Sequence, residues 1–251
     1  INTSLSQLSP QIAPVAPTPV QVIAPPAVPE MAFGAAKWKQ YFGDVGVEPP
    51  LPKNIYEILE SPCPFWPEKK VKETHLLTLI PQTVDGKPLT LHRVDTLVQA
   101  PKKGNPTRYR AYQQDIQRVY GNTPAPASHW VLMTRDILPG TRAKSNSNMY
   151  SYQLKLIEDY RQKTQIPYQL PNLLDATLVI LIEYVFRGLC LYPGEPSHPE
   201  IFTRCIEKIN YNTPVPVAVG GFRVSGNPGI DIHPSTNWHD DRDGVACLRK
   251  L

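Results

Sequence analysis

Proline is spread so densely through this chain that it limits the folds the chain can adopt. The 251 residues include 29 prolines, whereas proline makes up roughly 5% of an average protein. A proline fixes its own φ angle, lacks an N–H donor and restrains the residue before it, so it marks loops and element ends. We therefore expect short helices and strands joined by rigid, extended loops.

The first 30 residues differ in composition from everything that follows. Residues 1–29 contain seven prolines and no charged side chain, and valine and alanine fill many of the gaps. This pattern excludes regular helix and central strand, and it predicts a disordered or polyproline II segment. We expect residues 1–30 to be a linker, with a docking peptide for an aromatic-lined groove as the alternative. Because the chain begins at Ile1, we also expect it to belong to a longer protein.

Residues 31–251 are enough for one domain with a core that needs no metal or disulfide. Hydrophobic residues make up 41% of the chain and charged residues 19%, which fits a globular protein. No apolar run reaches the roughly 20 residues that span a bilayer. The four cysteines are scattered without a C-x-x-C pair, which argues against a zinc ribbon and favours reduced thiols.

The spacing of apolar residues predicts an α+β domain in which an antiparallel sheet packs against a few helices. Asn54 is expected to cap the second helix, Asp85 and Gly86 to form a hairpin turn, and Tyr152 to lie on the packed face of a helix. Residues 95–98 fit helix or strand equally. The predicted helices are 33–43, 54–59, 109–120, 149–163 and 172–187, and the predicted strands are 75–81, 89–91, 130–134, 202–209, 215–224, 230–233 and 245–248.

Two residues are candidates for nucleophilic catalysis. A cysteine nucleophile needs a histidine beside it and a third group that orients the histidine. Cys63 lies in a loop with three prolines and could pair with His129 or His239. Cys205 and Cys247 lie in apolar segments, where cysteine is usually inert. Cys63 and His129 are therefore the candidate catalytic pair, although no local motif supports them.

A group of histidines and aspartates near residue 240 contains ligand types that bind zinc, manganese or iron. The group comprises Asp231, His233, His239, Asp240, Asp241 and Asp243. Its spacing differs from the helical H-E-x-x-H motif, and consecutive side chains on an extended strand point to opposite faces. We expect no tight metal site and no cofactor; His233, His239 and Asp241 are the candidates should a metal bind.

A basic, tyrosine-containing segment at 102–112 is the candidate for nucleic-acid binding. Lys102, Lys103, Arg108 and Arg110 could neutralise phosphates, and the tyrosines at 109 and 112 could stack on bases. The same residues could equally form a solvated loop before an amphipathic helix. The net charge of +4 does not decide between the two interpretations.

Several sequence blocks together resemble a known but uncharacterised domain. The blocks are 33–46, 49–52, 61–64, 73–75, 88–91, 128–134, 203–205, 219–222 and 244–246. Together they resemble a C-terminal domain of large proteins from chlamydia-like bacteria that live inside amoebae, and the resemblance covers residues 31–251. It implies a module appended to a longer bacterial protein, either cytoplasmic or delivered to a host cell as an effector, and it implies no catalytic residue.

Three functional hypotheses follow. The first is a non-catalytic interaction or accessory module that binds a protein partner, because the chain has a linker-like leader and no catalytic motif. The second is a cysteine- or histidine-dependent hydrolase or transferase, and the third is a nucleic-acid-binding module. Convergence of Cys63, His75, His129, His233 and His239 in space would favour an enzyme.

Overall fold

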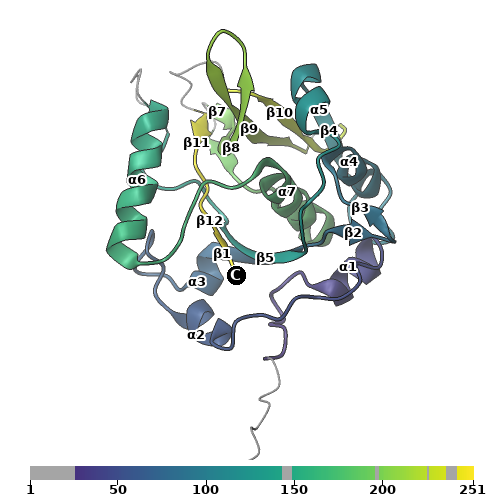
Figure 1. The fold of residues 1–251 in the computed structure, drawn as a ribbon, viewed down its shortest axis with the longest axis horizontal. Coiled ribbons are helices and arrows are strands. Elements are labelled where there is room, and N and C mark those ends of the chain that lie inside the picture. Colours follow the sequence, from purple (N-terminus) through teal and green to yellow (C-terminus); the bar gives the residue numbers. More distant parts are fainter. Residues whose placement is uncertain (1–25, 143–148, 196–197, 225, 236–241) are drawn as a thin grey trace, which may run out of the picture.

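A computed structural model describes residues 26–142, 149–195, 198–224, 226–235 and 242–251, and these residues form the predicted α+β arrangement of antiparallel strands packed against helices (Figure 1). Residues 1–30 were predicted to be a disordered linker, and residues 1–25 of this segment lie outside the described part of the chain.

Two separate sheets form the framework. The smaller, antiparallel sheet has the strand order β1 (His75–Ile80), β5 (His129–Thr134) and β12 (Leu248–Lys250). The larger sheet has an antiparallel centre and a parallel pair at each edge. Its strands, in spatial order, are β11 (Asp243–Gly244), β8 (Phe202–Asn210), β9 (Pro214–Arg223), β10 (Gly229–Pro234) and β4 (Arg108–Tyr112).

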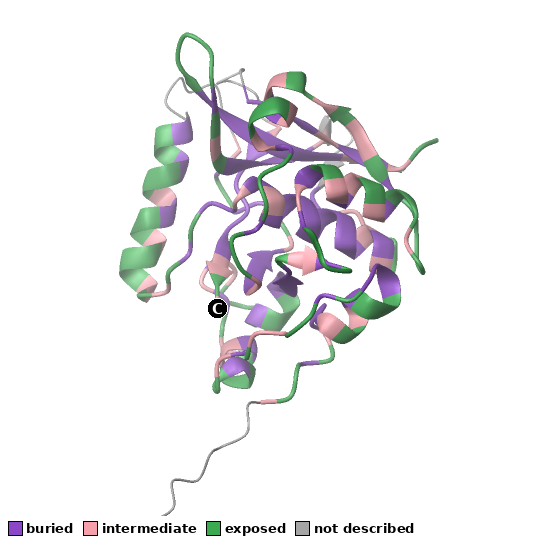
Figure 2. Cartoon of the chain, turned by 45° about the vertical axis from the view of Figure 1, so that its right-hand side comes forward, coloured by how far each residue is buried: buried purple, intermediate pink, exposed green. Residues whose placement is uncertain are grey.

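Helix α7 (Leu173–Arg187) lies between the two sheets and contacts β1 and β5 on one side and β8 and β9 on the other (Figure 1). Its sequence is apolar on nearly every face, which suits a helix that is covered on all sides. Gly188 ends the helix in the left-handed conformation at φ 70°. Figure 2 shows that α7 is buried along most of its length, and the prediction of helix 172–187 is confirmed.

Shorter elements surround this framework. Helix α6 (Met149–Thr164) packs against a smaller hydrophobic cluster through Tyr150, Ile157 and Tyr160. Tyr152, which was predicted to lie on the packed face of this helix, is exposed. The other helices are α1 (Ala35–Tyr41), α2 (Ile55–Glu60), α3 (Val71–Thr74), α4 (Leu91–Gln99), α5 (Gln114–Tyr120) and α6 (Met149–Thr164), and the small hairpins are β2 (Thr83–Val84) with β3 (Lys87–Pro88) and β6 (Pro193–Glu195) with β7 (His198–Glu200).

The predicted helix 109–120 is wrong in its first half. Residues Arg108–Tyr112 form β4, which pairs with β10, and only Gln114–Tyr120 is helical. The Tyr109 amide donates to the Asp95 carboxylate at 2.9 Å, and the Gln113 amide donates to the Ile232 carbonyl at 3.2 Å. An exposed sheet edge supplied partners that outweighed the helical spacing of the side chains.

Two other boundaries differ from the prediction. The return arm of the Asp85–Gly86 hairpin is Lys87–Pro88 rather than residues 89–91, because the Thr90 hydroxyl accepts from the Arg93 amide and starts α4. Asn54 precedes α2 but its side chain makes no capping bond.

The strand predicted at 245–248 begins only at Leu248. The three preceding amides, of residues 245–247, donate to hydroxyl groups of Thr141, Thr203 and Thr134 at 2.8–3.1 Å. Threonine side chains from β5, from β8 and from the segment after β5 therefore replace the ladder that a strand would have formed.

Candidate functional site

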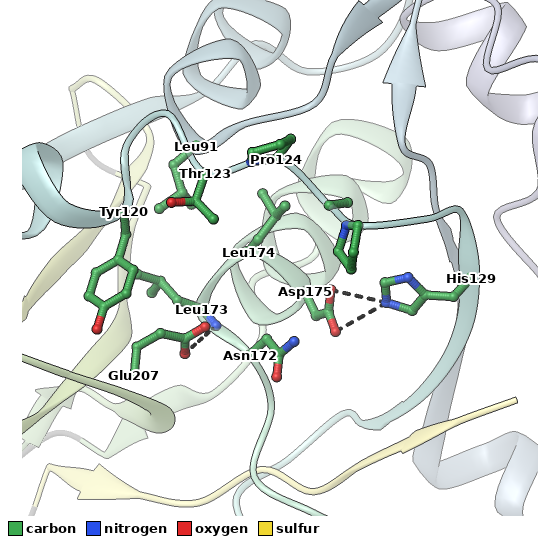
Figure 3. Close-up of a pocket in the computed structure, with 12 residues that line it drawn as sticks. Leu91, Tyr120, Thr123, Pro124, His129, Asn172, Leu173, Leu174, Asp175 and Glu207 are labelled. Carbon is green, nitrogen blue, oxygen red and sulfur yellow. Dashed lines mark hydrogen bonds and ion pairs between the residues drawn. The ribbon is translucent and has the colours of Figure 1, made fainter.

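A pocket of about 130 Å³ opens at the first turn of α7 (Figure 3). Apolar side chains and prolines form most of its wall, and two carboxylates and one histidine supply the charges. The lining residues are Leu91, Tyr120, Thr123, Pro124, Ala125, Pro126, His129, Asn172, Leu173, Leu174, Asp175 and Glu207. We call this the helix-start pocket.

His129 begins β5, and its imidazole is held on both sides. The Nε2 atom lies 3.3 Å from both carboxylate oxygens of the buried Asp175, and Nδ1 lies 3.0 Å from the Ala127 carbonyl oxygen. Burial disfavours the charged ring, but the Asp175 carboxylate and the Ala127 carbonyl outweigh burial and raise the pKa of His129. Because both nitrogens face acceptors, the doubly protonated ring fits this position best.

Glu207, on β8, is the second carboxylate of the pocket. Its Oε2 accepts from the Leu173 amide at 2.8 Å, so it satisfies a free N–H at the start of α7. Burial, helped by the negative charge of Asp175, raises the pKa of Glu207 to about 7. Lys250 pairs with Asp175 at 3.6 Å, whereas Glu207 has no ion-pair partner among the described residues.

The hydroxyl groups of the pocket are not paired with His129. They bind main-chain carbonyls: Tyr120 donates to Lys208 at 2.8 Å and Thr123 to Val119 at 3.5 Å. His129 has no free nitrogen to act as a base. What the pocket offers instead is a partly solvent-open carboxylate, Glu207, in an apolar surround.

The structure places Cys63 away from His129. Cys63 is buried in a satellite cluster with Phe65, and Phe65 stacks on His75 at a ring distance of 6.3 Å. The register of β1 and β5 pairs His75 with Thr134 and places His129 opposite Ile80. His75 and His129 therefore lie about five residues apart along the sheet, or roughly 17 Å. The full satellite cluster comprises Cys63, Phe65, Leu138, Tyr150, Ile157, Tyr168, Leu170, Val245 and Cys247.

The remaining thiols are poor nucleophiles where they stand. All four cysteines are free, and burial raises the pKa of Cys190, Cys205 and Cys247. A buried thiol whose pKa is raised stays protonated and unreactive at neutral pH.

The candidate metal ligands are only partly within the described residues. His239 and Asp241 lie outside them. His233 lies on β10 with its ring edge-on to Phe202, and Asp231 binds the Arg110 side chain and the Ala111 amide. Among the residues that the structure describes, no three histidine, cysteine or acidic side chains form a group able to hold a metal.

The basic segment at 102–112 is divided between two places. Lys102 donates its amide to Tyr41, and Lys103 lies over the Tyr41 ring at 5.5 Å, so both lie beside α1. Arg108 and Arg110 lie on β4 at the edge of the larger sheet.

The sequence did not mark Asp175 and Glu207, the acidic residues of the helix-start pocket, as functional candidates. Asp175 interrupts the apolar stretch of α7, and Glu207 lies in the alternating segment of β8, so each resembles an ordinary solvated charge. One signal was present: an acidic residue in the first turn of an otherwise apolar helix is favoured by the helix dipole.

Comparison with known proteins gave no match: no family model, no curated protein and no solved structure matches this chain. None of the helices in the described parts of the chain is long and apolar enough to cross a bilayer.

Proposed function

We propose that this domain is a non-catalytic interaction module that binds a protein partner by accepting a lysine or arginine side chain in the helix-start pocket. The observation that carries the proposal is Glu207, a carboxylate in an apolar pocket without an ion-pair partner among the described residues. An incoming cation would supply the missing charge, and the apolar wall would contact its aliphatic stem. The bacterial setting and delivery to a host cell remain predictions from the sequence resemblance.

The size of the pocket supports a side chain as the occupant. Pockets for substrates and drug-sized ligands usually measure roughly 300–1,000 Å³, whereas this one measures about 130 Å³. Leu91, Pro124 and Leu174 surround the space (Figure 3), and Pro126 also lines it. A single side chain presented by a partner fills such a space.

The state of Glu207 makes the proposed binding depend on pH. With a pKa of about 7, its carboxyl group is partly protonated near neutrality. A bound cation favours the ionised form, so binding displaces the proton. A basic side chain should therefore bind more tightly at about pH 8 than at about pH 6.

The test uses two peptides of the same length and shape that differ in the charge of one side chain: acetyl-Gly-Arg-Gly-amide and its citrulline analogue, in which a neutral urea replaces the guanidinium. Nuclear magnetic resonance titration of the isotope-labelled protein should show shifts at Tyr120, Leu174 and Glu207 with the arginine peptide only. The Glu207→Gln variant should lose these shifts. Glu158→Gln, an exposed change on α6, is the matched control and should keep them.

Two outcomes would overturn the proposal. One is an equal response to both peptides, which would mean that charge plays no part. The other is binding of the arginine peptide that Glu207→Gln leaves unchanged, which would place the site elsewhere.

A further inference from the structure

A second site is formed by three arginines at the edge of the larger sheet. Arg108 and Arg110 come from β4, and Arg223 comes from the end of β9. Together with Tyr109 and Asn227 they line an open hollow of about 340 Å³, which we call the arginine hollow. It belongs to different elements from the helix-start pocket, so it stands independently of the function proposed above.

Gly229 on β10 lies against the stems of Arg108 and Arg110. The strand register places Gly229 directly between Arg108 on one neighbour and Arg223 on the other. A Cβ atom on Gly229 would overlap the Arg108 carbonyl oxygen, and it would lie 2.9 Å from the Arg110 Cγ and 3.2 Å from the Arg108 Cγ. The main chain of β4 and both arginine stems therefore occupy the space that a side chain at position 229 would need, so glycine allows β4 and its arginines to approach closely here.

The positive charge of the hollow is only partly neutralised. Arg110 Nη2 pairs with Asp231 at 3.2 Å, and Arg223 pairs with Glu200. Within the described residues Arg108 has no ion pair. The Arg110 Nη1 atom is buried and has no acceptor. Because that atom is closed off from solvent, the charge that an entering anion can match is that of the exposed Arg108.

We propose that the arginine hollow binds the phosphate group of a small phosphorylated molecule. Guanidinium groups donate in a planar fork that matches phosphate oxygens, and three of them converge on one hollow here. A smaller hollow of about 170 Å³, lined in part by Gln99 and Thr107, adjoins it and shares Arg108 and Asn227. This second space can hold the organic part of the ligand.

A nucleic-acid strand fits the same observations less well. Base stacking needs exposed aromatic faces, but the Tyr109 hydroxyl is turned inward and donates to the Leu91 carbonyl at 2.9 Å. The Tyr112 ring packs edge-on against the Tyr109 ring and is therefore partly covered. Arg108 and Arg110 share one hollow, while Lys102 and Lys103 lie beside α1. The positive charges of Arg108 and Arg110 are therefore concentrated in one place and do not form a continuous strip along which a nucleic-acid backbone could lie.

The experiment measures binding of inorganic pyrophosphate to the full chain by isothermal titration calorimetry at low salt. Arg108→Gln and Arg110→Gln should each weaken binding about tenfold, as expected for the loss of a charge-assisted hydrogen bond. Arg108→Lys should recover only part of the affinity, because a lysine keeps the charge but loses the fork. The control Arg118→Gln, on exposed α5, should bind like the unchanged protein.

Circular dichroism melting verifies that each variant is folded, and Gly229→Ala provides a second test that leaves every charge in place. We expect Gly229→Ala to weaken binding because the new methyl group would overlap the Arg108 carbonyl oxygen and so displace β4, which carries both arginines. Failure of the unchanged protein to bind pyrophosphate, or binding that none of these variants weakens, would overturn the proposal. A single-stranded RNA octamer that binds far more tightly than pyrophosphate, and through the same arginines, would replace it with a nucleic-acid interface.

Discussion

His75 and His129 lie at opposite ends of the same pair of strands, and their surroundings shift their pKa values in opposite directions. His75 is fully buried beside Phe65, between the Thr74 hydroxyl at 2.9 Å and the Tyr168 hydroxyl at 3.1 Å. Burial lowers the pKa of His75 to about 4, while the pKa of His129 is raised. One ring is therefore kept neutral and the other is kept charged.

Helix α7 is the source of this difference, because it presents a carboxylate near each end of the strand pair. At the first end Asp175 contacts His129 directly. At the other end Glu183 is paired with Arg135 at 3.2 Å and with Arg187 at 3.5 Å, so its charge is already matched. Arg135 also adds a positive charge close to His75, which lowers the pKa of that ring further.

The comparison shows that the nearest counter-charge, and not burial alone, decides the state of a histidine in this domain. A histidine ring that lies beside a carboxylate forms an ion pair with it and is no longer available as a base. A ring that receives only hydroxyl groups stays neutral, and it must be protonated when the chain unfolds in acid.

The largest effect should come from loosening α7 itself, because the helix positions both carboxylates. Leu181 is fully buried between the sheets, and Leu181→Ala should lower the free energy of unfolding by about 2–5 kcal/mol. Urea unfolding followed by circular dichroism measures this loss. Leu189→Ala, at an exposed position just beyond the helix, should change stability by less than about 0.5 kcal/mol.

The second prediction removes the counter-charge at one end only. Asp175→Asn should leave the imidazolium of His129 and the ammonium of Lys250 without their anion, at a cost of about 3 kcal/mol near pH 7. Nuclear magnetic resonance titration should show that the pKa of His129 falls to below its ordinary value of 6.5. An unchanged pKa would contradict the role assigned to Asp175, and Asp159→Asn on exposed α6 serves as the control.

The third prediction concerns the other end of the strand pair. Because the pKa of His75 is lowered from 6.5 to about 4, the unfolded chain binds a proton in this window that the folded chain does not. Stability should therefore fall as the pH falls from about 6.5 to about 4, by about 2–3 kcal/mol from this group.

Urea unfolding over this pH window should separate the contribution of His75 from those of the acidic residues. His75→Gln should give a curve that declines less steeply than that of the unchanged protein. Two parallel curves would show that His75 does not titrate as described.

The sequence predicted the framework well because each of its parts carries a local signal. Pro171, the apolar run and Gly188 define α7, and the Asp85–Gly86 turn defines the hairpin after β1. Asn172 lies at the start of α7 as expected, although its side chain makes no capping bond. These signals act within a few residues, so they can be recognised without knowing the fold.

Polar residues inside the domain could not be predicted in this way. Gln153 is buried on α6, where an apolar side chain such as Tyr152 was expected, because its Oε1 accepts from the buried Arg204 at 2.6 Å. Arg204 in turn lies 3.8 Å from the buried Asp243. Each of these residues fits its place only because a distant partner satisfies it. The same dependence hid Asp175 and Glu207.

The smallest predicted effect is a gain in stability when Glu207 loses its charge, and it tests the helix-start pocket rather than the two histidines. The pKa of Glu207 is raised from 4.5 to about 7, so the folded chain retains a proton in this window that the unfolded chain has lost. The contribution of Glu207 to the free energy of unfolding is fully present below about pH 4.5 and is lost as the pH rises through about 7. The full shift corresponds to about 3 kcal/mol, but the side chain is partly open to solvent, so about 1–2 kcal/mol is expected.

Glu207→Gln should recover this loss, because the amide oxygen can still accept from the Leu173 amide and carries no charge to bury. The variant should be more stable than the unchanged protein at about pH 8 and equally stable at about pH 4.5, as measured by urea unfolding. Glu158→Gln on exposed α6 should show no such dependence on pH. If Glu207→Gln were destabilising at about pH 8, the carboxylate would be paired with a cation, and the pocket would have no unmatched charge to offer a partner.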